Sequence, residues 1–179
     1  CIRDRIETTK IYSIAGALPS GTRLISHRPF RSPHHTVSPQ GLTGGGAVPK
    51  PGEISLAHNG VLFMDEFPEF DRRTKESLRQ PLEDGVITIS RAGGSLTYPS
   101  NIMVVAAMNP CPCGFLGHPT KDCTCSQAAV NRYRDKVSGP ILDRIDLHVE
   151  VQSVDYAQLA DTTRGEPSSA IRQRVNRAR

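Results

Sequence analysis

Two short apolar stretches that each end in polar side chains constrain the fold of this 179-residue chain more than any other feature. Val61–Met64 follows a glycine and runs directly into Asp65 and Glu66. Ile102–Met108 runs into Asn109 in the same way. Short, wholly apolar runs are typical of strands that are buried on both faces, as in parallel sheets. Because helical and loop segments separate the two runs, the sequence predicts an α/β fold with a parallel sheet.

The remaining elements are marked by turns and periodicity. Val86–Ser90 and Ser95–Tyr98 flank a Gly-Gly pair, which predicts a hairpin. Proline and glycine recur throughout Arg31–Gly52, so we expect a long loop or insertion there, either a contact surface or a linker. The other predicted elements are helices at Thr8–Ala17, Asp71–Leu82 (capped by Asp71) and Ala170–Arg179, and a third strand at Leu147–Val151.

The carboxylates that follow Val61–Met64 are expected at the carboxyl edge of the sheet, where open α/β folds bind ligands. Asp65 can hold Mg²⁺ there, commonly through water. Glu66 faces the opposite way along the strand and can activate an attacking water. This is the Walker B arrangement of P-loop ATPases. The alternative is that both acids only cap the following turn.

Two more polar residues suit a nucleotide site. Asn109 can hydrogen-bond a γ-phosphate or orient water, since an amide both donates and accepts. An Asn-Pro turn is the alternative. Arg144 lies between apolar residues in Ile141–Leu147, and a guanidinium suits the binding of phosphoryl charge. A surface ion pair with Asp143 or Asp146 is the simpler reading of that arginine.

Longer motifs carry a family resemblance. They are Arg28–Thr36 (RPFRSPHHT), Gly44–Gly46, Pro51–Gly60 (PGEISLAHNG) and Asn109–Gly114 (NPCPCG). Together they resemble the magnesium-chelatase-like AAA+ ATPases of the ComM/YifB group, hexameric ring motors of which one branch is associated with DNA branch migration. The resemblance implies a partial AAA+ core with a helix-2 insertion, a hairpin before the sensor-1 strand and a cysteine-rich insertion. It also implies ATP and Mg²⁺ as cofactors.

The resemblance assigns a role to each candidate residue. Asp65 would bind Mg-ATP and Glu66 would be the catalytic base. Asn109 would be sensor 1, and Arg144 would be an arginine finger that serves a neighbouring subunit. Arg91, at the hairpin tip, would face a central pore and contact single-stranded or branched DNA through its phosphates. A solvated turn residue is the alternative for Arg91.

One element of the family is missing from the sequence. No Gly-x-x-x-x-Gly-Lys-Ser/Thr loop, which cradles the β- and γ-phosphates, occurs in the chain. We therefore expect this loop and its central strand to precede Cys1 in a longer parent, so that the piece alone is an inactive ATPase with an unpaired strand edge. Residues 1–165 are then a core fragment with a cysteine-rich insertion at 110–126, and residues 166–179 begin a C-terminal helical lid.

Four of the five cysteines lie close together in the sequence: Cys111, Cys113, Cys123 and Cys125. Four thiolates can bind one tetrahedral Zn²⁺, although the single residue inside each pair is a shorter spacing than usual. His118 could replace one cysteine as a ligand. Reduced thiols without metal and a pair of disulfides are the alternatives. A structural zinc would stiffen a loop that is too polar to bury a core of its own.

Composition narrows the class of protein further. No apolar run approaches the ~20 residues that cross a bilayer and no signal-peptide pattern opens the chain, so we expect a cytoplasmic protein with no membrane partner. The net charge of +4 permits DNA binding without demanding it. The sequence favours part of a hexameric ATPase motor that acts on DNA. The alternatives are a metal-chelatase-type motor that remodels a protein and a non-enzymatic zinc- and nucleic-acid-binding module.

Overall fold

A computed structural model describes residues 1–46, 48–91, 94–151 and 165–178. By the contacts within it, the chain divides into two compact units, Cys1–His148 and Val149–Arg179. The second unit holds helix α9 (Ser168–Ala178), where the sequence predicted a polar helix. In the part of the chain that the structure describes, no helix is both long and apolar enough to cross a membrane.

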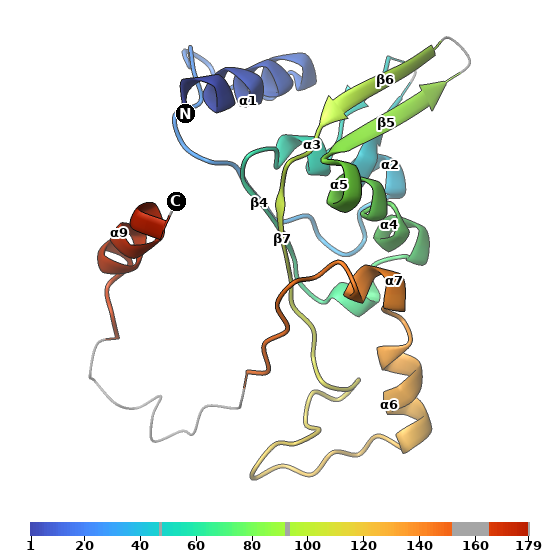
Figure 1. Cartoon of the computed structure of the whole chain (residues 1–179). Helices are drawn as coiled ribbons and strands as arrows, with labels where there is room; N and C mark the ends of the chain where they lie inside the picture. Colours follow the sequence, from blue (N-terminus) through green and yellow to red (C-terminus); the bar gives the residue numbers. More distant parts are fainter. Residues whose placement is uncertain (47, 92–93, 152–164, 179) are drawn as a thin grey trace. The chain divides into compact units, whose positions relative to one another are not determined.

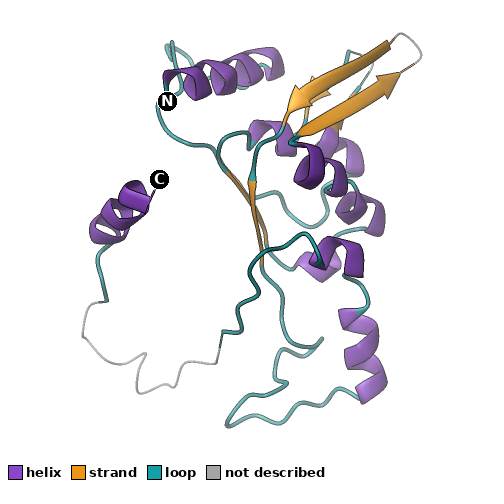
Figure 2. Ribbon diagram, in the orientation of Figure 1, coloured by secondary structure: helices purple, strands orange, loops and turns teal. Residues whose placement is uncertain are grey.

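Three parallel strands form the sheet that the sequence predicted (Figures 1 and 2). They are β1 (Phe30–Arg31), β4 (Val61–Met64) and β7 (Met103–Ala106), in the order β1-β4-β7. Strand β4 has the predicted bounds, and β7 lies inside the predicted apolar run. The first and last residues of β4 pair with the first and last residues of β7, so the two strands end at the same edge. The predicted α/β class with a parallel sheet is confirmed.

The core packs around β4, where Leu62 and Met64 are fully buried. The elements that pack there include α3 (Glu53–Leu56), the 3-10 helix η1 (Phe67–Glu69) and α7 (Gly139–Leu142). Because β4 and the segment after it are both anchored in this core, the acidic pair between them is held at a defined place. The buried core residues from these and neighbouring segments include Leu42, Ile54, Phe67, Phe70, Leu78, Val137 and Ile141.

The single helix predicted at Asp71–Leu82 is two helices, α4 (Arg72–Glu76) and α5 (Arg79–Asp84). Asp71 caps the first of them as expected, its carboxylate accepting a backbone hydrogen bond at 2.9 Å. The break follows from Pro81, which has no N–H to donate to the carbonyl four residues earlier and whose ring crowds that carbonyl.

The expectation of an irregular loop across Arg31–Gly52 is wrong in part. The segment contains helix α2 (Pro39–Thr43) and an antiparallel pair of two-residue strands, β2 (Gly44–Gly45) and β3 (Lys50–Pro51). Gly44 has a φ of +99°, and a Cβ at this position would lie 2.4 Å from the carbonyl oxygen of Lys50. Glycine is required here because the two backbones approach so closely. The glycines therefore mark a tight structure rather than an irregular one.

The predicted hairpin is present as β5 (Val86–Arg91) and β6 (Gly94–Pro99) (Figure 1). It is attached to the rest of the unit through Tyr98, whose hydroxyl donates a hydrogen bond to the carbonyl of Pro49 at 2.9 Å. The backbone of Arg91 ends β5. Its side chain, for which the sequence predicted a DNA contact, lies outside the described part of the structure.

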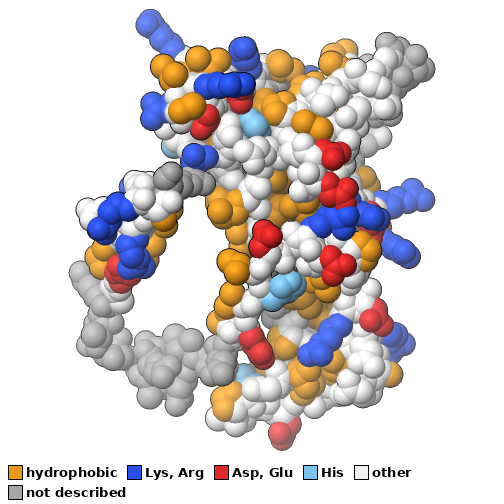
Figure 3. All heavy atoms as spheres, viewed as in Figure 1, with side chains coloured by type: hydrophobic (Ala, Val, Ile, Leu, Met, Phe, Trp, Pro, Cys, Tyr) orange, Lys and Arg blue, Asp and Glu red, His pale blue; other side chains and the backbone are white. Residues whose placement is uncertain are grey.

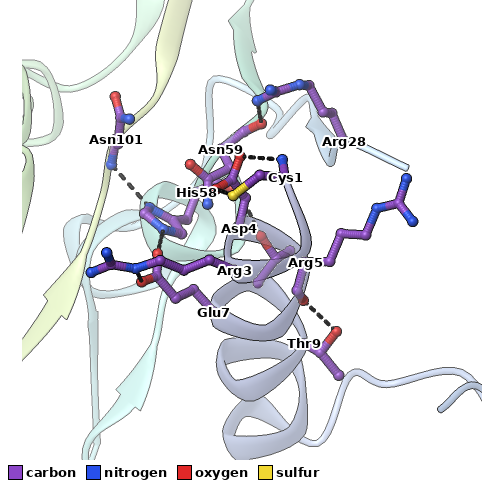
Figure 4. A network of polar contacts seen from close by, with 11 residues as sticks. Cys1, Arg3, Asp4, Arg5, Glu7, Thr9, Arg28, His58, Asn59 and Asn101 are labelled. Atoms are coloured by element: carbon purple, nitrogen blue, oxygen red, sulfur yellow. Dashed lines mark hydrogen bonds and ion pairs between the residues drawn. The ribbon is translucent and has the colours of Figure 1, made fainter. Parts of the chain in front are cut away.

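Helix α1 (Ile2–Ala15) begins earlier than the predicted Thr8–Ala17. Figure 4 shows the polar network that ties it to the turn before β4. The buried ring of His58 accepts a hydrogen bond from the N–H of Asn101 at its Nδ1 (3.1 Å), and its Nε2 lies 3.5 Å from Glu7 of α1. Burial lowers the pKa of His58, although the carboxylate of Glu7 opposes that shift.

The third strand predicted at Leu147–Val151 is not formed. Leu147, Val149 and Val151 are 81%, 80% and 85% exposed. Alternating apolar residues favour a strand only where a neighbouring strand supplies hydrogen bonds and a surface to pack against. No strand among the described residues pairs with this segment.

Candidate active site and metal centre

The carboxyl ends of β4 and β7 bring the acidic pair and Asn109 to one edge of the sheet. Beyond the paired strands, the N–H of Ala107 donates to the carbonyl of Met64 at 2.9 Å. The carbonyl of Ala107 in turn accepts from the N–H of Phe67 at 2.9 Å. These bonds keep the two segments together past the strands. Glu66 and Asn109 consequently line one groove, with a volume of about 580 Å³.

Asp65 stands at the same strand end and is exposed. Its Oδ1 accepts a hydrogen bond from the N–H of Glu66 at 2.9 Å. This is the turn-capping contact that the sequence left open as an alternative, and it leaves Oδ2 outside that bond. Asp65, Glu66 and Asn109 offer carboxylate and amide oxygens, which are the ligands that Mg²⁺ prefers. The residues at this edge therefore fit a magnesium ion.

Glu66 combines an unusual backbone with an unpredicted partner. Its φ of 51° and ψ of 44° lie in the left-handed region, which is uncommon for residues with a Cβ and is enriched at functional sites. Its Oε2 lies 3.0 Å from Nδ1 of His35. The His35 ring packs edge-on against Phe70, with ring centroids 6.4 Å apart. The insertion after β1 thus reaches the carboxylate expected to act as the base.

A buried lysine holds the segment that follows Glu66. Lys75 is only 4% exposed, and its Nζ donates hydrogen bonds to the carbonyls of Pro68 at 3.0 Å and Phe70 at 2.7 Å. Burial lowers the pKa of Lys75. The two carbonyl contacts offset part of the cost of burying the ammonium group and hold the backbone beside the acidic pair in place.

The other wall of the groove comes from the chain around α6 (Gln127–Arg134) (Figure 1). Arg132 and Tyr133 on the helix and Lys136 just beyond it line the groove. Glu69 of η1 and Pro112 of the cysteine segment also line it. The sequence assigned no role to these five residues.

Arg144 lies apart from the groove lining. Its guanidinium pairs with Glu83 of α5 and donates to the carbonyl of Pro140. An ion pair was the simpler alternative for this arginine, although the observed partner is Glu83 and not the predicted Asp143 or Asp146. An arginine finger acts on the site of a neighbouring subunit, so its place outside its own groove accords with that role.

The four clustered cysteines converge in space as the sequence predicted. Their Sγ atoms all lie within 4.8 Å of one another. Cys111 lies 3.4 Å from Cys113 and 3.6 Å from Cys123, and Cys113 lies 3.5 Å from Cys123. A tetrahedral zinc with Zn–S bonds of about 2.3 Å needs sulfur atoms about 3.8 Å apart. The cluster therefore fits a four-coordinate metal, with Cys125 as the fourth ligand.

The structure argues against two of the alternatives, a pair of disulfides and a ligand role for His118. The separations are far longer than a disulfide bond of about 2.05 Å, and all the cysteines are free. His118 is engaged elsewhere, because its Nδ1 accepts from the N–H groups of Thr120 and Lys121. The pKa values of the thiols diverge, because the backbone N–H of Phe115 lowers the pKa of Cys113 to about 6. The backbone N–H of Cys125 lowers the pKa of Cys123, but burial and the neighbouring thiols outweigh it and raise that pKa to about 12. A bound cation would favour the thiolate form of each ligand.

Comparison with known protein families now adds to this geometry. The family model described as "Magnesium chelatase, subunit ChlI" matches residues 2–159. The chain belongs to this family. The parallel sheet with its flanking helices is accordingly part of a P-loop NTPase-like core, and the magnesium-chelatase-like, ComM/YifB-like resemblance found in the sequence is confirmed.

Individual relatives extend the comparison. The uncharacterized protein YifB of Escherichia coli is 47% identical over 177 residues, which covers 98% of this chain and 34% of YifB. The competence protein ComM of Haemophilus influenzae is 51% identical over 154 residues, covering 85% of this chain and 30% of ComM. The DNA replication licensing factor Mcm6 of Drosophila melanogaster is 30% identical over 111 residues, which covers 59% of this chain and 12% of Mcm6. The chain spans about a third of the length of the first two relatives.

Proposed function

We propose that this chain is part of a ring-forming, ATP-hydrolysing motor that acts on DNA. The observation that carries the proposal is the shared groove at the ends of β4 and β7, where Glu66 and Asn109 stand together beside Asp65. Membership of the chelatase family and the likeness to a competence protein and a replication licensing factor support an AAA+ ATPase. Such a motor would work in the cytoplasm.

Each residue of the edge has a proposed task in phosphoanhydride hydrolysis. Mg²⁺, when bound, would neutralise phosphate charge, and Asp65 would hold it. Glu66 would accept the proton of the attacking water, and the amide of Asn109 would orient that water or the γ-phosphate. Arg144 would stabilise the developing charge in the next subunit of a hexamer. Arg91 at the hairpin tip would contact DNA phosphates without sequence preference.

The domain assignment is part of this proposal. Residues 1–165 would form this chain's share of the ATPase core, and residues 166–179, which include α9, would begin a helical lid. In this proposal another part of the intact protein supplies the phosphate-binding loop. Figure 3 shows Lys and Arg side chains interspersed with Asp and Glu over the face in view, so a few placed cations such as Arg91, not one large basic patch on that face, would make the DNA contacts.

The test is the ATPase rate of the intact protein with and without single-stranded and branched DNA. We expect hydrolysis that DNA stimulates, and stimulation that weakens as salt rises because phosphate contacts release counterions. Hydrolysis that DNA leaves unchanged and a protein partner stimulates would favour a metal-chelatase-type motor, which the family description makes the second candidate. DNA binding without any hydrolysis would leave a zinc- and nucleic-acid-binding module.

We also propose that Cys111, Cys113, Cys123 and Cys125 hold one structural Zn²⁺. Metal analysis of the purified chain should find one zinc per molecule, and Co²⁺ in its place should show the absorption bands of tetrahedral thiolate ligation. Changing Cys113 to Ser should abolish stoichiometric zinc and lower the melting temperature, since metal binding and folding are coupled. Cys1→Ser is the matched control, because Cys1 is exposed and lies outside the cluster. Equal zinc in both variants would refute the site.

A further inference from the structure

Helix α6 is fixed against the core by one face. Val130 and Tyr133, three residues apart and therefore on the same side of the helix, are 2% and 6% exposed. The chain continues from the helix into Val137 and Ile141, which belong to the main core cluster. Arg132, next to Tyr133 on this helix, is exposed and lines the groove beside the buried face.

Tyr133 of this helix lines the same groove as Asn109. Burial raises the pKa of the Tyr133 phenol, and a hydrogen bond from the backbone of Asn109 opposes that shift. Lys136 reinforces the wall, because its Nζ lies over the Tyr133 ring, 5.5 Å from the centroid. The helix wall and the candidate sensor residue therefore face the same groove.

The charges in the groove are paired with one exception. Lys136 donates to both carboxylate oxygens of Glu69 at 2.8 and 3.0 Å. Glu66 lies 3.0 Å from His35. Within the part of the chain that the structure describes, no hydrogen bond or ion pair engages the guanidinium of Arg132, which lines the same groove. A free guanidinium beside Glu66 and Asn109 is a binding group for an anion.

We propose that Arg132 binds the terminal phosphate of the nucleotide held by its own subunit, which makes it a further catalytic residue of the site. This inference rests on the proposed ATPase function. A guanidinium can bind a phosphate through two parallel hydrogen bonds, and it keeps its charge at any working pH. The groove volume of about 580 Å³ lies in the range of small-molecule sites. Asn109, in the same groove, supplies the neutral donor that such a phosphate would also need.

Arg134 offers a matched control on the same helix. It is exposed, carries the same charge and lies two residues away, outside the residues that line the groove. The intact protein with Arg132→Ala would be compared with Arg134→Ala for binding of a non-hydrolysable ATP analogue and of ADP. We expect Arg132→Ala to weaken binding of the ATP analogue by at least about tenfold, which corresponds to the loss of one charge-assisted hydrogen bond. Binding of ADP should be unchanged. Arg134→Ala should change neither.

Hydrolysis and a conservative variant complete the test. The kcat for ATP should fall roughly 10²- to 10³-fold in Arg132→Ala, as when a single charge-stabilising donor is removed from an active site. The kcat of Arg132→Lys should lie between those of Arg132→Ala and the unsubstituted protein, because lysine keeps the charge but cannot bind through two parallel hydrogen bonds. Circular dichroism and melting temperature would confirm that all variants fold alike.

Several outcomes would overturn the inference. If ATP and ADP binding weaken equally, Arg132 supports the fold or another part of the nucleotide. If subunit assembly is lost and nucleotide binding is retained, the guanidinium pairs with an acidic side chain of a neighbouring subunit. If Arg132→Ala behaves like Arg134→Ala, the residue has no role in the groove. A parent protein that binds ATP without hydrolysing it would instead refute the proposed function, while the comparison of ATP with ADP would still test Arg132.

Discussion

Replacing Arg144 by alanine in the intact protein is expected to lower the kcat for ATP by roughly 10³- to 10⁵-fold, the range found for arginine fingers. The side chain is 28% exposed and is held beside α5 by Glu83 and the carbonyl of Pro140, away from its own groove. We therefore expect each subunit to retain its affinity for nucleotide and to lose only the rate. Steady-state hydrolysis together with nucleotide titration would measure both quantities.

Mixing variants tests whether the arginine acts between subunits. Arg144→Ala keeps Glu66, and Glu66→Gln keeps Arg144, so mixed rings would contain some interfaces with both groups. Partial recovery of activity on mixing is expected, and its absence would contradict action across an interface. Glu83→Gln is the matched control, because it breaks the observed ion pair and spares the arginine. If Glu83→Gln is as inactive as Arg144→Ala, the ion pair itself and not the free guanidinium matters.

Glu66→Gln should lower the kcat for ATP by about 10²- to 10⁴-fold, the usual contribution of a general base. The amide keeps the size and polarity of the carboxylate but cannot accept the proton of water. Binding of ATP should persist, because Asp65 and Asn109 remain. The fold should persist too, since the side chain is 55% exposed.

Glu69→Gln provides the control for Glu66. Glu69 lines the same groove, but its carboxylate is paired with Lys136 and comes from η1, one turn further along the chain. We expect the kcat of Glu69→Gln for ATP to stay within a few-fold of that of the unsubstituted protein. Equal losses in the two variants would show that negative charge in the groove, and not a base at position 66, supports hydrolysis. Single-turnover measurements would separate the chemical step from product release.

The strand and hairpin predictions succeeded where the determining signal is local. Val61–Met64 forms β4, as its length of four apolar residues between a glycine and two acids favours. The hairpin follows from alternating residues around a Gly-Gly turn. The helix at Asp71–Leu82 was predicted as one piece because the apolar spacing outweighed Pro81. Leu147–Val151 failed for the opposite reason, since its strand needs a partner that periodicity cannot reveal.

The residues of the candidate site can likewise be separated into those that local sequence predicts and those that it does not. Glu66 and Asn109 were predictable because each immediately follows a strand, and parallel strands end at a common edge. The cysteine cluster was predictable from spacing. His35, Lys75 and Arg132 were not assigned to the site, because their positions near it depend on packing between segments remote in sequence. The paired histidines in the insertion offered only a weak hint, and a lysine or an arginine on a polar helix is ordinarily solvated.

The parallel sheet also has a consequence for how the protein folds. Each strand pair joins distant parts of the chain, Phe30 with Val61 and Val61 with Met103, and contacts of that kind form slowly because a long loop must close first. The β5–β6 hairpin can form locally and early. Glu66 and Asn109 meet only when the most remote strand pair has closed. Hydrogen-exchange labelling during refolding should therefore protect the hairpin amides before those of β4 and β7, with the edge that carries Glu66 and Asn109 assembled last.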